Sequence, residues 1–244
     1  MSRQDSHETD LPPVHLVRQY DTHRLIPSKY NPDLASVLTR IADSDQHLQD
    51  LFDLDQATND RLWGESGRLP GIDGHELAFG VPNYRVINAS FTHAHPLGSR
   101  FNGPDRGAWY AAFVVETAQA EVAFHKATEY AEIGRFEDSI TYDDYLADFS
   151  GDFHDVRGAA EFAYALNPNS YVASQGLAQR LLDAGSSGIV YPSVRHSGGT
   201  CIGCFRPALV GHVRKDKRYR FAWEGNPVPV INCLSGISGE RGFV

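Results

Sequence analysis

The spacing of apolar and polar positions along the chain changes near residue 84. Before that point, apolar residues recur at helical intervals, and a polar, acidic stretch over residues 1–13 is expected to be a disordered lead-in. Helices are predicted over residues 31–43 and 45–63, and a loop rich in Gly and Pro follows over residues 64–83. Residues 1–83 are therefore predicted to be an N-terminal extension that is helical after its lead-in.

Short apolar segments separated by turns make up most of the chain after residue 84. Such segments are typical of strands, and AWYAAFVV is apolar on both faces, as a buried central strand would be. Strands are predicted over residues 84–91, 108–115, 143–145, 153–156, 187–193, 200–206, 208–214 and 219–225. Helices are predicted over residues 118–130 and 171–184, with Thr117 and Ser170 as N-caps and Gly185 ending the second helix.

This order of elements predicts a mixed α+β fold of mostly antiparallel short strands with flanking helices. Residues 84–225 are predicted to form the domain that carries the chemistry. Residues 226–244 are predicted to be a C-terminal tail.

The composition and the charge of the chain indicate which kinds of binding partner and which cellular location to expect. The 244 residues are 41% hydrophobic and 22% charged, and the net charge is −9. Because nucleic-acid backbones attract clustered Lys and Arg, direct nucleic-acid binding is not expected, and the one basic cluster, RKDKRYR at residues 214–220, is interpreted as a solvated strand edge. No apolar run approaches the roughly 18 residues of a membrane span. The N-terminus lacks the pattern of a secretory signal, and three cysteines fit a reducing compartment, so a cytoplasmic location is predicted.

Several familiar chemical motifs are missing from the sequence. Neither a Walker A sequence nor the glycine fingerprint of a dinucleotide fold occurs. Cys201 and Cys204 lie three apart in a predicted strand, where they would face opposite sides, so they are expected to be core cysteines. His93 and His95 form an H-x-H pair without a third ligand and are expected on a surface loop, so no metal site is predicted.

The stretch RFNGPDRGAWYAAFVVETAQAEVAFH, residues 100–125, contains three side chains with possible chemistry. Arg100 lies beside a glycine-rich turn, where a guanidinium can bind a phosphate or pair with a nearby carboxylate. Tyr110 in its apolar strand could stack on a flat ligand or serve as an ordinary core tyrosine. Glu121, about one turn into its helix, could accept a hydrogen bond from a ligand or be solvated.

A second stretch, SSGIVYPSVRHSGGTC at residues 186–201, places Ser193 at the end of a strand, before the pair Gly198–Gly199. Such a turn presents a hydroxyl and backbone amides, which suits a diphosphate or a ribose. An ordinary hairpin connection would have the same pattern. Spacing alone leaves both interpretations open.

Together these stretches resemble the RES family, which is named for an Arg, a Glu and a Ser. The resemblance covers about residues 90–210 and rests on GSRFN, GAWYAA, ETAQAEVAFH and GIVYPSVRHSGGTC, which occur in the family's order. It implies a core related to the ADP-ribosyltransferase toxins and a bacterial toxin with an Xre-like antitoxin as its partner. It also implies an enzyme that consumes NAD as co-substrate and needs no metal.

The resemblance assigns roles to particular residues. Glu121 is expected to stabilise the oxocarbenium-like transition state that forms when the nicotinamide–ribose bond breaks. Tyr110 is expected to stack against nicotinamide, and Arg100 with Asn102 is expected to bind the cofactor. Ser193 is expected to contact the ribose or to position Glu121.

One departure bears on the acceptor of the ADP-ribose. Transferases that modify arginine carry Glu-x-Glu, whereas the acid upstream of Glu121 is Glu116, five residues away. The leading hypothesis is ADP-ribosylation of a cytosolic protein, with transfer to an arginine side chain considered doubtful. Breakdown of free NAD, as a glycohydrolase or a phosphorylase, is the alternative. A non-catalytic RES-like protein that binds a partner or senses NAD is the rival from another class.

Overall fold

A computed structural model describes residues 11–30 and 71–234. The two helices predicted over residues 31–43 and 45–63 lie outside the described residues. The chain forms two compact units. Among the described residues, the first unit contains 11–24, 76–121 and 146–214, and the second contains 25–30, 71–75, 122–145 and 215–234.

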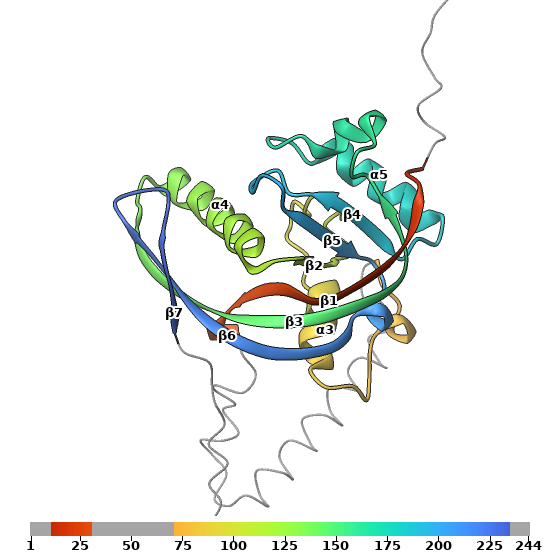
Figure 1. Ribbon diagram of the computed structural model, residues 1–244, viewed down its shortest axis with the longest axis horizontal. Coiled ribbons are helices and arrows are strands. Elements are labelled where there is room, and N and C mark those ends of the chain that lie inside the picture. Colours follow the sequence, from red (N-terminus) through yellow and green to blue (C-terminus); the bar gives the residue numbers. More distant parts are fainter. Residues whose placement is uncertain (1–10, 31–70, 235–244) are drawn as a thin grey trace, which may run out of the picture. The chain divides into compact units, whose positions relative to one another are not determined.

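Seven strands form one sheet in the part of the chain that the structure describes. They are β1 (Val14–Pro27), β2 (Trp109–Ala112), β3 (Glu137–Asp155), β4 (Gly188–Pro192), β5 (Thr200–Cys204), β6 (Gly211–Glu224) and β7 (Val230–Leu234). Their order is β1-β2-β5-β4-β3-β6-β7, with β1 also pairing with β3, and the long strands β1, β3 and β6 run side by side in Figure 1. The β3–β4 pair is parallel, and β1–β2, β2–β5, β4–β5 and β6–β7 are antiparallel. The predicted mixed α+β class is confirmed.

The helices are α3 (Tyr84–Thr92), α4 (Val115–Ile133) and α5 (Val172–Asp183), with short 3-10 turns η1 (Ser28–Tyr30), η2 (Gly74–Glu76), η3 (Ala160–Leu166) and η4 (Pro207–Leu209). The strand predicted over residues 84–91 is wrong, because this segment is α3 and buries Ile87 and Phe91 four residues apart on one helical face. Thr117 is not an N-cap, since α4 begins two residues earlier. The predicted helix α5 is confirmed, but its N-cap is Tyr171 and not Ser170. Gly185 follows its end with φ of 76° and an amide bonded to the Leu182 carbonyl.

The strands differ from the prediction chiefly in length. Residues 143–145 and 153–155 of the predicted segments belong to the single strand β3. Residues 211–214 and 219–224 belong to β6, whereas residues 208 and 209 lie in η4. Residues 14–27 form β1, so the helical prediction is wrong for this part of the N-terminal third. Residues 230–234 form β7, within the predicted tail.

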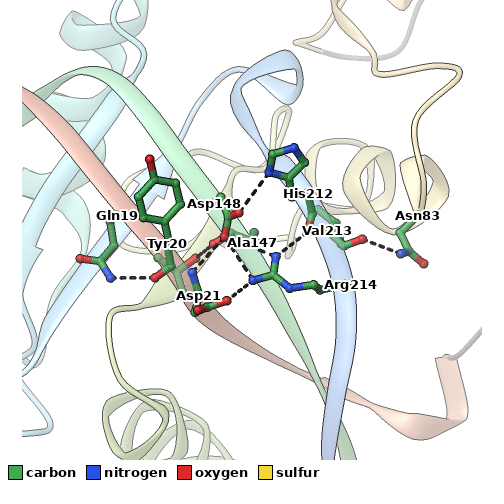
Figure 2. A network of polar contacts seen from close by, with 10 residues as sticks. Gln19, Tyr20, Asp21, Asn83, Ala147, Asp148, His212, Val213 and Arg214 are labelled. Carbon is green, nitrogen blue, oxygen red and sulfur yellow. Dashed lines mark hydrogen bonds and ion pairs between the residues drawn. The ribbon is translucent and has the colours of Figure 1, made fainter. Parts of the chain in front are cut away.

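In the first unit, polar contacts join β1, β3 and β6 around Asp148, as Figure 2 shows. The Asp21 amide donates to Asp148 Oδ1 over 2.9 Å, and His212 Nδ1 lies 3.1 Å from Asp148 Oδ2. Arg214 reaches both Asp148 and Asp21. Asp21 and His212 have φ of 53° and 48°, a left-handed backbone that non-glycine residues rarely adopt. The carboxylate of Asp148 therefore ties together two irregular positions of neighbouring strands.

Each unit has its own buried apolar residues. In the first unit the buried side chains include Trp109, Leu177, Leu181, Ile189, Val190 and Ile202. In the second unit the core is aromatic: Tyr142 contacts Phe221 with ring centroids 4.9 Å apart, and Tyr130 contacts Trp223 at 5.0 Å. Among the described residues, no helix is long and apolar enough to cross a membrane.

Candidate functional site

The carboxylate of Glu121 is held by the hydroxyl of Ser193, which follows β4. Ser193 Oγ donates to Glu121 Oε1 over 2.6 Å. The same oxygen accepts the backbone amides of Arg195 at 3.1 Å and His196 at 3.0 Å. Because a serine oxygen has two lone pairs and one proton, the two amides direct that proton towards the carboxylate. Glu121 is therefore oriented as an acceptor by a donor whose direction is fixed by the backbone.

The turn over residues 193–199 lies directly against α4. Thr117, one helical turn before Glu121, is fully buried, and its Oγ1 lies 2.7 Å from His196 Nδ1. Gly199 is also close to the helix, since a Cβ built there would lie 2.5 Å from Thr117 Oγ1. The helix face that carries Glu121 thus contacts this turn at three places. Sequence reasoning did not single out Thr117 and His196 as site residues, and spacing along the chain holds no signal for this contact.

Tyr110 positions the loop that carries Arg100. Its hydroxyl accepts the Phe101 amide at 2.9 Å and donates to Asn102 Oδ1 at 2.8 Å. Its ring lies against Gly203 of β5, where a Cβ would come within 3.3 Å of Tyr110 Cε1. Burial raises the pKa of the Tyr110 hydroxyl well above its usual value, so it remains a proton donor at neutral pH.

Asn102 and Arg100 are both more enclosed than their predicted role in binding a cofactor suggests. Asn102 is 3% exposed and uses its amide on the Gly103 carbonyl and its oxygen on Tyr110. Arg100 is 6% exposed, donates from Nη1 to the Asn167 carbonyl at 2.9 Å, and stacks 4.7 Å above the Tyr171 ring. Within residues 11–30 and 71–234, Arg100 Nη2 finds no hydrogen-bond acceptor.

Tyr191 and Cys201 connect the Arg100 loop with the Glu121 carboxylate. Burial raises the pKa of the Tyr191 hydroxyl, the charges of Cys201 and Glu121 raise it further, and Arg100 opposes them. Burial and then the Glu121 charge raise the pKa of the Cys201 thiol to about 12, and its Sγ lies 4.0 Å from Glu121 Oε1. Tyr191 of β4 is paired with Cys201 of β5, and its ring packs against Phe101 with ring centroids 4.8 Å apart. The loop that carries Arg100 and the Glu121 carboxylate therefore contact neighbouring positions of the sheet. With so high a pKa, Cys201 is a neutral thiol and a poor nucleophile.

No group of three His, Cys, Asp or Glu side chains suited to a metal occurs in the described ranges. His93 and His95 are exposed after α3, as expected. Cys201 and Cys204 are free and buried, which confirms that they are core cysteines.

Comparisons with known proteins give a family and a likeness to solved structures. The model of the RES domain matches residues 77–224, a range that includes Arg100, Tyr110, Glu121 and Ser193. No curated protein matches the chain. Among solved structures, the chain is similar to a chain in the crystal structure of the M. tuberculosis MbcT–MbcA toxin–antitoxin complex. The identity is 13%, the match covers 54% of this chain and 73% of that chain, and the TM-score is 0.38.

Proposed function

Because the chain belongs to the RES domain family, we propose that it is the toxin of a toxin–antitoxin pair and cleaves the nicotinamide–ribose bond of NAD. The observation that carries the proposal is the hydrogen bond from Ser193 to Glu121. It supplies an oriented carboxylate, which is what a reaction through a cationic ribose requires. An antitoxin protein, of the Xre-like kind, is the proposed partner.

The proposed reaction breaks the bond between the nicotinamide nitrogen and C1′ of the ribose. The bonding electron pair leaves with nicotinamide, whose ring nitrogen is cationic before the step and neutral after it. Positive charge then develops on the ribose, and the Glu121 carboxylate stabilises this charge more strongly in the transition state than in bound NAD. Tyr110 offers its ring to nicotinamide while its hydroxyl holds Asn102, and Arg100 contributes positive charge behind the site.

The proposed acceptor of the ADP-ribose is a side chain of a cytosolic protein. Glu116 is exposed and lies five residues before Glu121, so the two carboxylates are about 140° apart around the helix. An acid in that position does not share the face of Glu121, which argues against activation of an arginine acceptor. Water and inorganic phosphate are the alternative acceptors, and each gives a different product.

The test is incubation of the full chain with labelled NAD in buffer, in buffer with phosphate, and with cell lysate. Label on a lysate protein means transfer, free ADP-ribose means hydrolysis, and ADP-ribose 1-phosphate means phosphorolysis. Glu121→Gln keeps the size of the side chain and removes its charge, and we expect nicotinamide release to fall about 100-fold or more. Glu116→Gln on the same helix is the matched control and should keep the wild-type rate.

A negative result would also be informative. If the folded wild-type chain releases no nicotinamide in any of the three conditions, the enzyme proposal is wrong. A non-catalytic protein that binds a partner or senses NAD would then be the better explanation. Binding of NAD without release of nicotinamide would favour the sensing role.

A further inference from the structure

The loop that carries Arg100 is held by one side chain of α5. Gln175 Nε2 donates to the Leu97 carbonyl at 2.9 Å and to the Ser99 carbonyl at 3.0 Å. A side-chain amide nitrogen has two protons, so both protons of Gln175 are used on this loop. Because the two carbonyls lie on either side of Gly98, one side chain fixes the backbone directly before the arginine.

The glycine at position 98 makes this close approach possible. Gly98 has φ of 69°, in the left-handed region that glycine adopts without strain. A Cβ built there would lie 2.7 Å from Gln175 Nε2 and 2.2 Å from the Asn102 carbonyl oxygen. The loop also closes on itself, since the Ser99 amide donates to that same carbonyl at 2.9 Å. The turn before Arg100 is therefore packed tightly against the amide of Gln175.

Arg100 itself contacts the segment that leads into α5. Its Nη1 donates to the Asn167 carbonyl at 2.9 Å, and its guanidinium lies 4.7 Å from the centre of the Tyr171 ring. Its Nη2 is buried and has no acceptor within the described part of the chain. A buried cationic N–H without an acceptor is costly. In the proposed function that acceptor is an oxygen of NAD, and the direction of this N–H depends on how the loop is held.

We propose that Gln175 is a positioning residue, which holds the loop so that Arg100 Nη2 meets its acceptor on NAD. This inference rests on the proposed function, and it assigns a role to a residue outside the Arg, Glu and Ser of the family name. Gln175 acts on the substrate only through the arginine. Tyr110 of β2 holds the same loop through the Phe101 amide and Asn102, so the loop is fixed from two sides.

The experiment compares Gln175→Met with Gln179→Met in the full chain. Methionine has nearly the length and helix propensity of glutamine but no N–H to donate. Gln179 lies one turn further along α5, is exposed and donates to Asp183. For Gln175→Met we expect the KM for NAD to rise about tenfold with little change in kcat, because the arginine contributes to binding and not to the bond that breaks. Gln179→Met should keep the wild-type KM.

A double-mutant cycle tests whether Gln175 acts through Arg100. In an Arg100→Gln background, Gln175→Met should raise the KM no further, since the side chain that it positions is gone. Arg100→Lys takes the place of Arg100→Gln if the latter does not fold, because lysine lacks the planar fork whose direction Gln175 sets. Urea denaturation shows which variants are folded.

Amide hydrogen exchange reports on the loop without any substrate. The amides of Gly98, Ser99, Phe101 and Asn102 all have acceptors in the structure. Gln175→Met should speed exchange over residues 98–102, because the loop opens more easily without the two bonds from α5. Gln179→Met should exchange like the wild type.

The outcomes separate this inference from the function on which it rests. If the wild-type chain cleaves NAD and Gln175→Met keeps the wild-type KM, the assignment of Gln175 is wrong and the function stands. An equal rise in KM with and without Arg100 also overturns the assignment, because the effect would then not pass through the arginine. If the wild-type chain releases no nicotinamide from NAD, the proposed function fails, and with it the link between Gln175 and NAD, whatever the exchange shows.

Discussion

The hydroxyl of Ser193 is engaged at each of its hydrogen-bonding positions, with two amides donating to it and one carboxylate accepting from it. Replacing Ser193 by Ala leaves both amides without this acceptor and Glu121 without its donor. We expect Ser193→Ala to lower the rate of nicotinamide release about 10- to 100-fold, since hydrogen bonds to charged groups contribute about 1.5–3 kcal/mol. Ser193→Thr keeps the hydroxyl and should stay close to the wild-type rate. A wild-type rate in Ser193→Ala would show that this hydroxyl does not orient the carboxylate.

Tyr110 contributes through its hydroxyl as well as its ring. Tyr110→Phe removes the acceptor of the Phe101 amide and the donor to Asn102, and both of those residues are buried. We expect the free energy of unfolding to fall by about 1–3 kcal/mol, the cost of leaving buried polar groups unpaired. Urea denaturation measures the change. Tyr20→Phe is the control, because Tyr20 is 60% exposed, and it should change stability by less than about 0.5 kcal/mol.

The turn that follows β4 depends on a glycine at its point of contact with α4. A Cβ on Gly199 would lie 2.5 Å from Oγ1 and 2.8 Å from Cγ2 of Thr117, which is buried and β-branched and cannot rotate away easily. We expect Gly199→Ala to lower the free energy of unfolding by about 1–3 kcal/mol, as overpacking does. It should also slow nicotinamide release, because the displaced turn carries Ser193.

A matched glycine on α5 tests whether this effect comes from the contact. A Cβ on Gly176 meets no atom within 4 Å, and the residue lies inside a helix. Gly176→Ala should raise the free energy of unfolding by up to about 1 kcal/mol, because Ala has the higher helix propensity. Thermal or urea denaturation of both variants makes the comparison. Equal effects of the two substitutions would mean that the approach of Gly199 to Thr117 does not matter.

The elements that the sequence predicts well are those with an uninterrupted pattern. The buried positions Leu177, Ala178 and Leu181 of α5 recur at helical spacing, and β4 and β5 are short, almost wholly buried strands. β1 escaped prediction because its alternation is broken. Its buried residues Val17 and Thr22 are five apart, an odd interval that reverses the exposed face, and left-handed Asp21 lies between them.

The charged run inside β6 led to the prediction of two short strands in place of one long strand. The sequence RKDKRYR suggested a solvated edge between two shorter strands. In the structure Lys215 and Arg218 pair with Asp143 of β3, so two of these charges are balanced by a neighbouring strand rather than by water alone. An ion pair across strands depends on the register of distant segments, and the local composition does not contain that register.

The sequence predicted only those residues of the candidate site that lie within short sequence motifs. Arg100, Tyr110, Glu121 and Ser193 were predicted from two short stretches, and the structure bonds Ser193 to Glu121 and places Tyr110 against the loop that carries Arg100. The contacts that complete the site join residues 72 to 80 positions apart, such as Ser193 with Glu121 and Cys201 with Glu121. Periodicity describes neighbours within a turn or a strand, and it has no bearing on pairs so distant in sequence.

Buried carboxylates on β3 make the stability of the molecule depend on pH. Burial on its own would raise the pKa of Asp143, but hydrogen bonds from Arg218 and Lys215 outweigh it and hold the pKa below the usual value. Asp155 follows the same pattern, with Arg157 as its main partner. A carboxyl with a lower pKa in the folded state binds fewer protons there than in the unfolded chain at mildly acidic pH. The stability that it contributes is therefore complete above the unfolded pKa of about 3.9 and is lost as pH falls through the folded pKa.

We therefore expect the free energy of unfolding to decrease as pH is lowered below about 5, and two substitutions to flatten this dependence. Asp143→Asn keeps the shape of a side chain that is 1% exposed and removes its charge, so at neutral pH it should cost about 2 kcal/mol, the scale of hydrogen bonds to charged groups. At a pH below the folded pKa, wild-type Asp143 is itself protonated, and the difference in the free energy of unfolding between the two proteins should disappear.

Asp155→Asn should behave in the same way. Urea denaturation of each protein over a pH series provides the measurement, with Asp216→Asn, an exposed aspartate of β6, as the control. A gap between wild type and Asp143→Asn that stays constant down to strongly acidic pH would contradict the argument, because the loss would then come from packing and not from the ionised carboxylate.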